Sequence, residues 1–247
     1  MLFFKRKTKA VSPISDTAKL RPDDNFKHIA FIMDGNGRWA TEQGMPREYG
    51  HSAGAKTMKK VCTYCCDIGF KACTVYAFST ENWKRPEKEV NAIIKILENY
   101  MDEIIRDYKS YHNRFKFIGD LSVLSPEMME KVRRVESLNL EYDQVFNIAF
   151  NYGGRSEIVN AFNRLSDKGV SHATEEDVSR EIYTAHCPDP DMIVRTGGDM
   201  RISNFLLWQA AYSELYFTDK YWPDLTEEDV DEIIRVFYSR KRRYGGI

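Results

Sequence analysis

Short apolar segments alternate with longer helical patterns along this chain, and that alternation limits the folds open to it. The apolar segments are rich in β-branched and aromatic residues and lie at 28–33, 72–78, 114–119, 145–150, 192–196 and 215–218. Between them, apolar residues recur at helical spacing over 52–69, 87–111, 125–138, 154–169, 174–185 and 226–243. Strands separated by helices pair in parallel and carry the helices on their faces. We therefore predict an α/β fold with a mainly parallel sheet, and we expect its functional residues at the carboxyl ends of the strands.

Several of the predicted helices have residues typical of helix ends. Gly69 suits a C-cap, and Ser125 followed by Pro126 suits an N-cap and a first helical position. Thr226 is expected to cap the last helix, which starts with acidic residues and ends with basic ones.

The length of 247 residues and the formal net charge of −1 set outer limits on the function. A chain of this length holds one large domain or two small ones. The small net charge predicts no nucleic-acid partner, and no apolar run approaches the ~20 residues of a membrane-spanning helix. Residues 1–25 are expected to form a flexible arm ahead of a domain at 26–247, because "MLFFKRKTKA" has too few apolar residues for a secretory signal. The alternative is that this basic arm touches a membrane weakly.

Four of the five cysteines lie close together in the sequence. Cys62, Cys65 and Cys66 fall in one predicted helix, and Cys73 follows on the next strand. The Cys-x-x-Cys spacing invites a zinc site, but no second pair of cysteines or histidines stands at ligand spacing. We interpret these residues as small buried hydrophobes in a reducing compartment, which predicts a cytoplasmic protein.

The first predicted strand ends in "MDGNGRW". Glycines let a backbone approach a ligand, and successive N–H groups at such a turn favour anions. An aspartate in an anion site would repel a phosphate unless a cation lay between them, so Asp34 suggests a diphosphate bridged by Mg²⁺. Arg38, Arg47 and His51 follow closely and could clamp the same group. The alternative is a turn with solvated charges.

The second predicted strand ends in "FSTENWKRP". This stretch offers polar contacts, an indole and a cation, from Ser79, Thr80, Glu81, Asn82, Trp83 and Arg85. It also resembles a capped helix start, which is the alternative interpretation.

The fifth predicted strand ends in "VRTGGDMRISNF". Arg195 and Arg201 flank a pair of glycines, and Ser203 is expected to open a helix that ends near Glu214. Two guanidinium groups, glycine N–H groups and a hydroxyl are suited to a second phosphate. The alternative is that both arginines pair with neighbouring acids. "NYGGR" at 151–155 is expected to pack near the site through its backbone.

Taken together, two anion sites at neighbouring strand ends imply two phosphorylated substrates, with one acid placed for Mg²⁺. The predicted helix at 87–111 begins just after Arg85 and adds an apolar wall. Phosphates at one end and apolar helices leading away from them suggest an isoprenoid diphosphate.

The motifs "HIAFIMDGNGRWA", "GHSAGA", "YAFSTENWKRP", "NYGGR" and "RTGGDMRISNFLLWQAAYSELYF" resemble those of the cis-prenyltransferases, and among them the bacterial undecaprenyl diphosphate synthases. The resemblance covers about residues 26 to 246. It implies a single α/β domain with a six-stranded parallel core and an apolar tunnel, a homodimer, and Mg²⁺ as cofactor. The implied activity is repeated cis addition of isopentenyl diphosphate to an allylic primer, usually farnesyl diphosphate. The resemblance also implies a transient contact with a membrane when the product is released.

The resemblance also implies roles for individual residues. Asp34 matches the catalytic, Mg²⁺-binding aspartate, and Glu214 matches a second Mg²⁺ ligand. Asn82 matches the residue often assigned as proton acceptor, although a carboxamide is not basic near neutral pH, so we expect it to orient a water or the released diphosphate. The residues that match the allylic diphosphate site and the polar loop over it are Gly35, Asn36, Gly37, Arg38, Trp39, Arg47, His51, Ser79, Thr80, Glu81, Trp83 and Arg85. Those that match the isopentenyl diphosphate site are Arg195, Arg201, Ile202 and Ser203, and "RRYGG" at 242–246 resembles the family's tail, which approaches the partner's site.

Two further positions bear on the product and the metal. In the family, a bulky residue just before "FSTENW" gives short products, whereas this chain has Ala77, so we predict a medium-length product of undecaprenyl type. The family usually has Gly-Gly-Glu where this chain has Gly198-Asp199, and the shorter carboxylate makes direct ligation of Mg²⁺ by Asp199 doubtful.

Three other classes of protein fit the sequence less well. Gly35-x-Gly37-x-x-Ala40 fits a relaxed dinucleotide-binding pattern, but Asp34 crowds the loop and no acid ends the second strand. A non-enzymatic accessory subunit would lack the Asp-Gly-Asn-Gly-Arg loop, which is intact here. A trans-prenyltransferase would carry Asp-Asp-x-x-Asp on a helix, and the only Asp-Asp in the sequence is 23–24.

Overall fold

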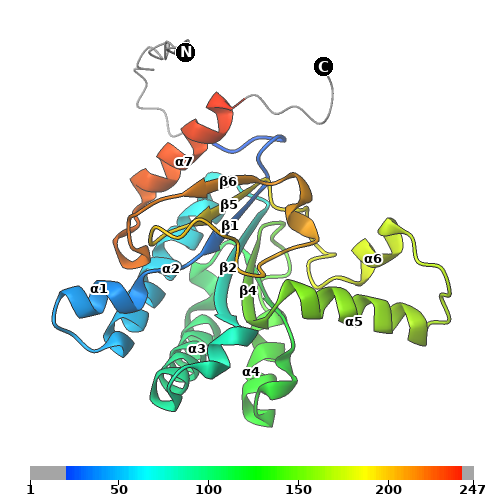
Figure 1. The fold of residues 1–247 in the computed structure, drawn as a ribbon, viewed down its shortest axis with the longest axis horizontal. Coiled ribbons are helices and arrows are strands. Elements are labelled where there is room, and N and C mark those ends of the chain that lie inside the picture. Colours follow the sequence, from blue (N-terminus) through cyan, green and yellow to red (C-terminus); the bar gives the residue numbers. More distant parts are fainter. Residues whose placement is uncertain (1–20, 241–247) are drawn as a thin grey trace, which may run out of the picture.

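Six parallel strands form the centre of the computed structural model, which describes residues 21–240 (Figure 1). In chain order they are β1 His28–Ile32, β2 Ala72–Ser79, β3 Arg114–Ile118, β4 Val145–Tyr152, β5 Met192–Arg195 and β6 Glu214–Phe217. In the sheet they lie in the order β3-β4-β2-β1-β5-β6, and each neighbouring pair is parallel. The predicted fold class is therefore confirmed.

Helices connect these strands and cover the sheet (Figure 1). The α-helices are α1 Asn36–Glu42, α2 Arg47–Ile68, α3 Glu87–Asp107, α4 Pro126–Glu136, α5 Gly154–Asp167, α6 Glu175–Glu181 and α7 Glu227–Ser239. Short 3-10 helices are η1 Thr80–Lys84, η2 Tyr108–Ser110, η3 Leu121–Val123, η4 Gln209–Tyr212 and η5 Trp222–Asp224.

The core is thicker on one face of the sheet than on the other. The larger apolar cluster joins the sheet to α2, α3, α4 and α7, with Phe31, Val61, Met101 and Ile234 fully buried or nearly so. The smaller cluster, on the opposite face, is closed by residues 202–210 around Phe205. Helices α5 and α6 pack on each other and extend to one side (Figure 1). β1 is buried on both faces, and apart from His28 its residues are apolar, as is usual for central parallel strands.

The predicted helix ends agree well with the structure. Gly69 follows α2 in the left-handed conformation, with φ of 113°. The Ser125 hydroxyl accepts a hydrogen bond from the Met128 N–H, and Pro126 is the first residue of α4. Thr226 caps α7 through a reciprocal contact with Asp229.

Two helix predictions need correction. The loop after β1 turns directly into α1, a helix that we did not predict because its two glycines indicated a turn, and α2 begins at Arg47 rather than at residue 52. Ser203 does not open a helix. Ser203 and Asn204 have φ of 48° and 64°, a left-handed conformation that cannot start an α-helix, and only η4 precedes β6.

The four clustered cysteines are buried free thiols, as predicted, and burial raises the pKa of Cys62 to about 11. Within residues 21–240, no helix is long and apolar enough to cross a membrane. Most of the predicted flexible arm lies outside the described residues. Its last part is packed against α7, because Asp23 exchanges hydrogen bonds with the Tyr238 hydroxyl.

Candidate active site

A polar cleft of about 770 Å³ lies at the carboxyl ends of β1, β2 and β5, the edge of the sheet where the sequence predicted chemistry. Most of the predicted site residues line it. From the first strand end and α2 these are Asp34, Gly35, Asn36, Gly37, Arg38, Arg47 and His51, from the second strand end Ala77, Ser79, Glu81, Asn82 and Arg85, and from the fifth Arg195, Arg201 and Ser203.

Asp34 and Arg195 join the first and fifth strand ends. The Arg195 guanidinium, only 5% exposed, donates from Nη2 to Asp34 Oδ2 at 2.8 Å, and Arg38 Nη2 lies 3.3 Å from Asp34 Oδ1. Burial acts to raise the pKa of Asp34, but hydrogen bonds from Arg195 and the Gly35 N–H, with the charges of both arginines, lower it overall. Asp34 is therefore an ionised carboxylate between two cations.

Arg195 also organises the loop that follows β5. Its Nη1 donates to the Arg201 carbonyl and to the Ser203 hydroxyl, each at 2.6 Å. Asp199 Oδ2 accepts from Arg195 at 3.1 Å and from Arg201 Nη2 at 2.8 Å. Both arginines thus pair with acids, as the alternative interpretation expected, yet they also line the cleft. Asp199 Oδ2 thus holds the two arginines of the fifth strand end together.

Two glycines after β1, Gly35 in the loop and Gly37 in α1, lie close to other side chains. Gly35 has φ of 99°, and a Cβ there would lie 2.5 Å from the Tyr221 ring. A Cβ on Gly37 would lie 2.5 Å from the centre of the Arg47 guanidinium. The loop is therefore shaped to bring the Arg47 cation close to the backbone that follows Asp34.

Arg47, His51 and Arg85 converge on one buried acid, Glu89 of α3. The distances to the Glu89 oxygens are 3.2 Å from Arg47 Nε, 2.9 Å from His51 Nε2 and 3.0 Å from Arg85 Nη1. Burial lowers the pKa of His51 although Glu89 acts to raise it. The two guanidinium groups form the cationic wall of the cleft on the side of α2 and α3.

The second strand end is both a capped helix start and part of the cleft. Ser79 and Asn82 form a reciprocal capping box around η1, in which Asn82 Oδ1 accepts from the Ser79 N–H at 3.1 Å. Glu81 accepts from Asn204 Nδ2 at 3.0 Å, so the loop after β5 is tied to the loop after β2. Asn204 also accepts at its backbone oxygen from the Gly154 N–H, at 2.7 Å, so the predicted backbone packing of "NYGGR" near the site is confirmed.

Several predicted site residues do not line the cleft. Trp39 donates from Nε1 to Asp224 and stacks on Tyr49, and Trp83 donates from Nε1 to Asn151. Thr80 begins η1 without lining the cleft, and Ile202 packs on the smaller core cluster.

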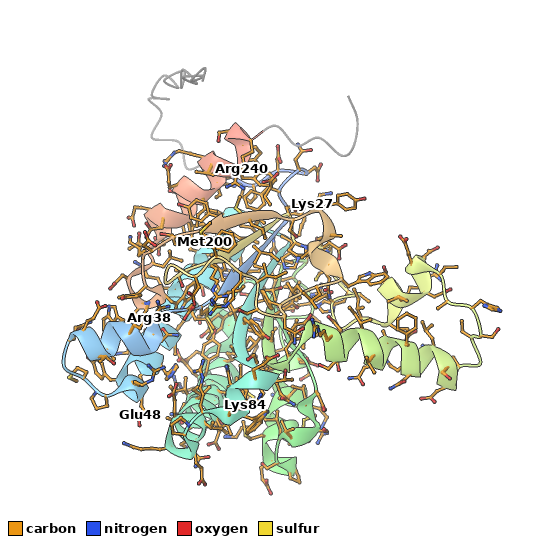
Figure 2. All side chains as sticks on the ribbon, viewed as in Figure 1. Lys27, Arg38, Glu48, Lys84, Met200 and Arg240 are labelled. Carbon is orange, nitrogen blue, oxygen red and sulfur yellow. The ribbon has the colours of Figure 1, made fainter. Side chains whose placement is uncertain are left out.

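Glu214 lies far from Asp34 within one chain. It starts β6 opposite Met192, the first residue of β5, whereas Arg195 at the other end of β5 contacts Asp34. Glu214 pairs with Arg240 at 2.8 Å, and Arg240 is well separated from Arg38 in Figure 2. The structure therefore does not bring the two predicted Mg²⁺ ligands together within this chain.

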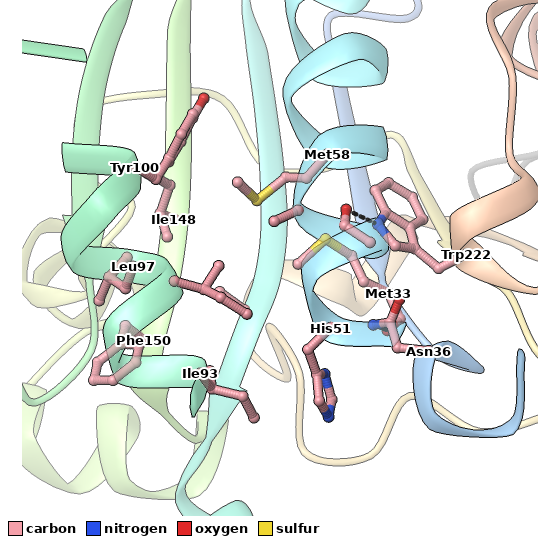
Figure 3. A pocket seen from close by; sticks show the side chains of 14 residues that line it. Met33, Asn36, His51, Met58, Ile93, Leu97, Tyr100, Ile148, Phe150 and Trp222 are labelled. Carbon is pink, nitrogen blue, oxygen red and sulfur yellow. Dashed lines mark hydrogen bonds between the residues drawn. The ribbon is translucent and has the colours of Figure 1, made fainter. Parts of the chain in front are cut away.

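An apolar cavity of about 70 Å³ adjoins the cleft and shares Met33, Asn36, His51, Ala77 and Ile93 with it. It runs between α2, α3 and the sheet, from His51 and Ile93 at one end to Met58 and Tyr100 at the other (Figure 3). The residues of α3 that line the cavity recur at helical spacing, namely Ile93, Ile96, Leu97 and Tyr100, whereas Lys95 and Glu98 pair on the outside of the helix.

Sequence reasoning missed three residues of the site. Glu89 and Asn204 hold cleft residues in place, and Tyr76 lines the cleft while donating to the Tyr152 carbonyl. Glu89 stands four residues after Arg85, a spacing at which opposite charges pair on a helix, and this signal could have identified it. No sequence signal pointed to Asn204 because the loop was expected to be a helix.

The donor set of the cleft can be compared with what Mg²⁺ requires. Among the described residues, no group of three or more His, Cys, Asp or Glu side chains could hold a metal. Mg²⁺ is commonly bound by only one or two carboxylates, with water and substrate phosphates supplying the other oxygens. One ionised carboxylate, Asp34, among the arginines of the cleft fits that mode of binding.

Comparisons with known proteins agree with this geometry. The family model for putative undecaprenyl diphosphate synthase matches residues 32–245. An isoprenyl transferase from Fusobacterium nucleatum is 47% identical over 90% of this chain and 96% of its own. A ditrans,polycis-undecaprenyl-diphosphate synthase ((2E,6E)-farnesyl-diphosphate specific) from Salmonella paratyphi A is 40% identical over 96% of each chain. The crystal structure of lavandulyl diphosphate synthase from Lavandula x intermedia, in complex with dimethylallyl diphosphate, superposes with a TM-score of 0.85, 28% identity, and coverage of 90% of this chain and 100% of that one.

A parallel α/β sheet with a cationic cleft and an adjoining apolar cavity defines a prenyl-transferring enzyme of the diphosphate synthase class. The chain belongs to the undecaprenyl diphosphate synthase family.

Proposed function

We propose that this enzyme adds isopentenyl diphosphate repeatedly to an allylic diphosphate, most naturally farnesyl diphosphate, and forms each new double bond in the cis configuration. One observation carries the proposal: two groups of arginines line the cleft together with Asp34, and this cleft adjoins an apolar cavity. We call these groups the two walls of the cleft; one consists of Arg38, Arg47 and Arg85, and the other of Arg195 and Arg201. Each wall suits one diphosphate, and the cavity suits a hydrocarbon chain. The relative specific for farnesyl diphosphate supports the choice of primer.

The two walls divide the substrates between them. Arg38, Arg47 and Arg85 hold the allylic diphosphate, whose hydrocarbon points into the cavity between α2 and α3. Arg195, Arg201 and Ser203 hold isopentenyl diphosphate with its double bond toward the allylic carbon, which is a positioning effect.

The chemistry follows from where charge develops. As the allylic C–O bond breaks, negative charge grows on the leaving diphosphate, and the arginines of its wall stabilise that charge. Asp34 would hold Mg²⁺ together with phosphate oxygens, and the metal would supply further stabilisation of the leaving group. The side-chain oxygen of Asn82, Oδ1, already accepts a hydrogen bond from the Ser79 N–H. We therefore assign Asn82 to orienting a water or the released diphosphate, either of which can take the proton.

The product must enlarge the apolar cavity. A cavity of about 70 Å³ is smaller than the roughly 150 Å³ in which a protein can hold one benzene molecule. Helices α2 and α3 would therefore separate, or the side chains between them would turn, as the chain grows. Ala77 offers little bulk at the cavity mouth, and we propose a medium-length product of undecaprenyl type, a precursor of a cell-wall lipid carrier.

We also propose a cytoplasmic homodimer that contacts the membrane transiently to release its product. Glu214 would then act as a metal ligand only if it belongs to another chain's site. The "RRYGG" tail lies outside the described residues, and its approach to a partner's site remains a prediction.

The test is incubation with labelled isopentenyl diphosphate, farnesyl diphosphate and Mg²⁺, followed by analysis of chain length and double-bond geometry. We expect a cis-polyprenyl diphosphate that disappears when the metal is chelated. Absence of elongation with every allylic primer would overturn the proposal.

A further inference from the structure

A buried carboxylate lies directly behind three side chains of the cleft. Glu89 is 5% exposed and lies in the first turn of α3, and the cleft lining does not include it. It nevertheless accepts hydrogen bonds from Arg47, His51 and Arg85, which do line the cleft. One acid thus connects three potential donors from α2 and from the segment that precedes α3.

Each arginine gives Glu89 only part of its hydrogen-bonding capacity. A guanidinium carries several N–H donors, and Arg47 uses Nε for Glu89 whereas Arg85 uses Nη1. The other N–H groups stay available for a ligand in the cleft. The Arg47 guanidinium also lies close to Gly37, in the space that a Cβ there would need.

The negative charge of Glu89 holds the two arginines in place but does not cancel their attraction for an anionic ligand. Hydrogen bonds from His51 and Arg47, with the charges of both arginines, outweigh burial and lower the pKa of Glu89, so the acid is ionised at neutral pH. Two guanidinium groups and one carboxylate leave this wall with a net positive charge that attracts a diphosphate. The carboxylate also limits the repulsion between the two cations.

We propose that Glu89 is a positioning residue that orients Arg47, His51 and Arg85, and so sets the affinity for the allylic diphosphate but not for isopentenyl diphosphate. The inference rests on the proposed function. The two substrates should respond differently because Arg195, on the proposed isopentenyl diphosphate side, pairs with Asp34 and Asp199 and does not contact Glu89.

The experiment measures KM for each substrate in Glu89→Gln, with Glu87→Gln as the matched control. Glu87 lies in the same turn of α3 but is exposed. In Glu89→Gln a neutral carboxamide of equal size replaces the carboxylate, and its NH₂ group cannot accept a hydrogen bond from Arg47, His51 or Arg85. We expect KM for the allylic diphosphate to rise about ten- to a hundredfold, the range for one charge-assisted hydrogen bond, with KM for isopentenyl diphosphate changed less than about twofold. Glu87→Gln should leave both constants unchanged.

A third variant, Glu89→Asp, keeps the charge with a shorter reach and should restore part of the allylic affinity. If thermal unfolding shows that Glu89→Gln does not fold, the same comparison of the two KM values is made in Glu89→Asp. An unchanged allylic KM, or an equal rise in both constants, would overturn the inference. Wild-type protein that fails to elongate any primer would instead overturn the proposed function, and the inference with it.

Discussion

Asp34 contacts one arginine from each wall of the cleft, Arg38 and Arg195. Its loss should affect catalysis far more than folding. In Asp34→Ala, Arg195 keeps Asp199, the Arg201 carbonyl and Ser203 as partners, so the loop after β5 should hold its shape. Removing the carboxylate that would anchor the metal should lower kcat about a hundredfold or more. Steady-state turnover with saturating substrates, beside a thermal unfolding curve, measures both effects. A kcat within a few-fold of wild type would contradict the assignment of Asp34.

The arginines of the two walls should affect different substrates. Arg195→Ala or Arg201→Ala should mainly raise KM for isopentenyl diphosphate, and Arg47→Ala should mainly raise KM for the allylic primer. Each lost charge-assisted contact is worth roughly 1.5–3 kcal/mol. Arg106→Ala is a suitable control, because Arg106 pairs with Asp107 on the surface. If the effects fall on the opposite substrates, the division of the cleft is wrong.

At the scale of the elements, the strands were predicted closely because β-branched and aromatic runs between turn residues leave few alternatives. All six strands lie within two residues of their predicted ends. The errors fall where local signals were ambiguous. The Gly35–Gly37 loop indicated a turn but continues into α1, and the segment after Ser203 had an apolar helical pattern that left-handed residues interrupt. Contacts such as those of Glu89 and Asn204 depend on tertiary folding, so no local pattern specified them fully.

Strands β1, β2 and β4 share a buried polar network that should make stability depend on pH. His28 donates or accepts at Thr74 Oγ1, 2.7 Å away, and at the Pro188 carbonyl, 2.6 Å away, and Asn147 Nδ2 donates to the same Thr74 oxygen at 2.9 Å. Complete burial lowers the pKa of His28 to about 4. A histidine with a lowered folded-state pKa contributes its full stability above its unfolded pKa and loses it as the pH falls toward 4.

Between pH 7 and pH 5, His28 takes up a proton in the unfolded chain but stays largely neutral in the folded protein. The free energy of unfolding should therefore fall by roughly 2 kcal/mol over this interval. Urea unfolding at the two pH values measures the difference. His28→Gln removes the titrating group and should show a smaller drop over the same interval. Equal drops in both proteins would mean that other groups carry the pH dependence.

An irregularity in β2 places Ala77 at the boundary between cleft and cavity. The register with β4 shifts on both sides of Phe78, and Ala77 lines both spaces. Ala77→Leu should narrow the entrance and shorten the product by at least one isoprene unit, because overpacking there opposes passage of the chain. Chromatography of the products after removal of the diphosphate measures this. An unchanged distribution would show that the growing chain does not pass Ala77.

At the scale of the whole molecule, the segment that ends in β6 exposes large apolar side chains within residues 21–240. The apolar stretch at 203–217 divides between core and surface. Phe205 and Leu206 are fully buried, whereas Tyr212 is 74% exposed and Leu215 39%. Met200, which precedes this segment and is labelled in Figure 2, is 78% exposed. Exposed apolar side chains that form a contiguous patch mark interaction surfaces.

We therefore expect a dimer with a two-fold axis near this segment. Sedimentation velocity at micromolar concentration should give about twice the mass of the 28.8 kDa chain. Leu215→Glu, which places a charge on the exposed edge strand β6, should shift the distribution toward monomer, whereas Val159→Glu on the exposed face of α5 serves as the control at a different surface. Because Glu214 adjoins Leu215 and lies far from Asp34 in its own chain, loss of activity in step with loss of the dimer would indicate that the site needs a second copy. A fully active monomer would exclude that role for the dimer, and a wild-type monomer at these concentrations would contradict the prediction itself.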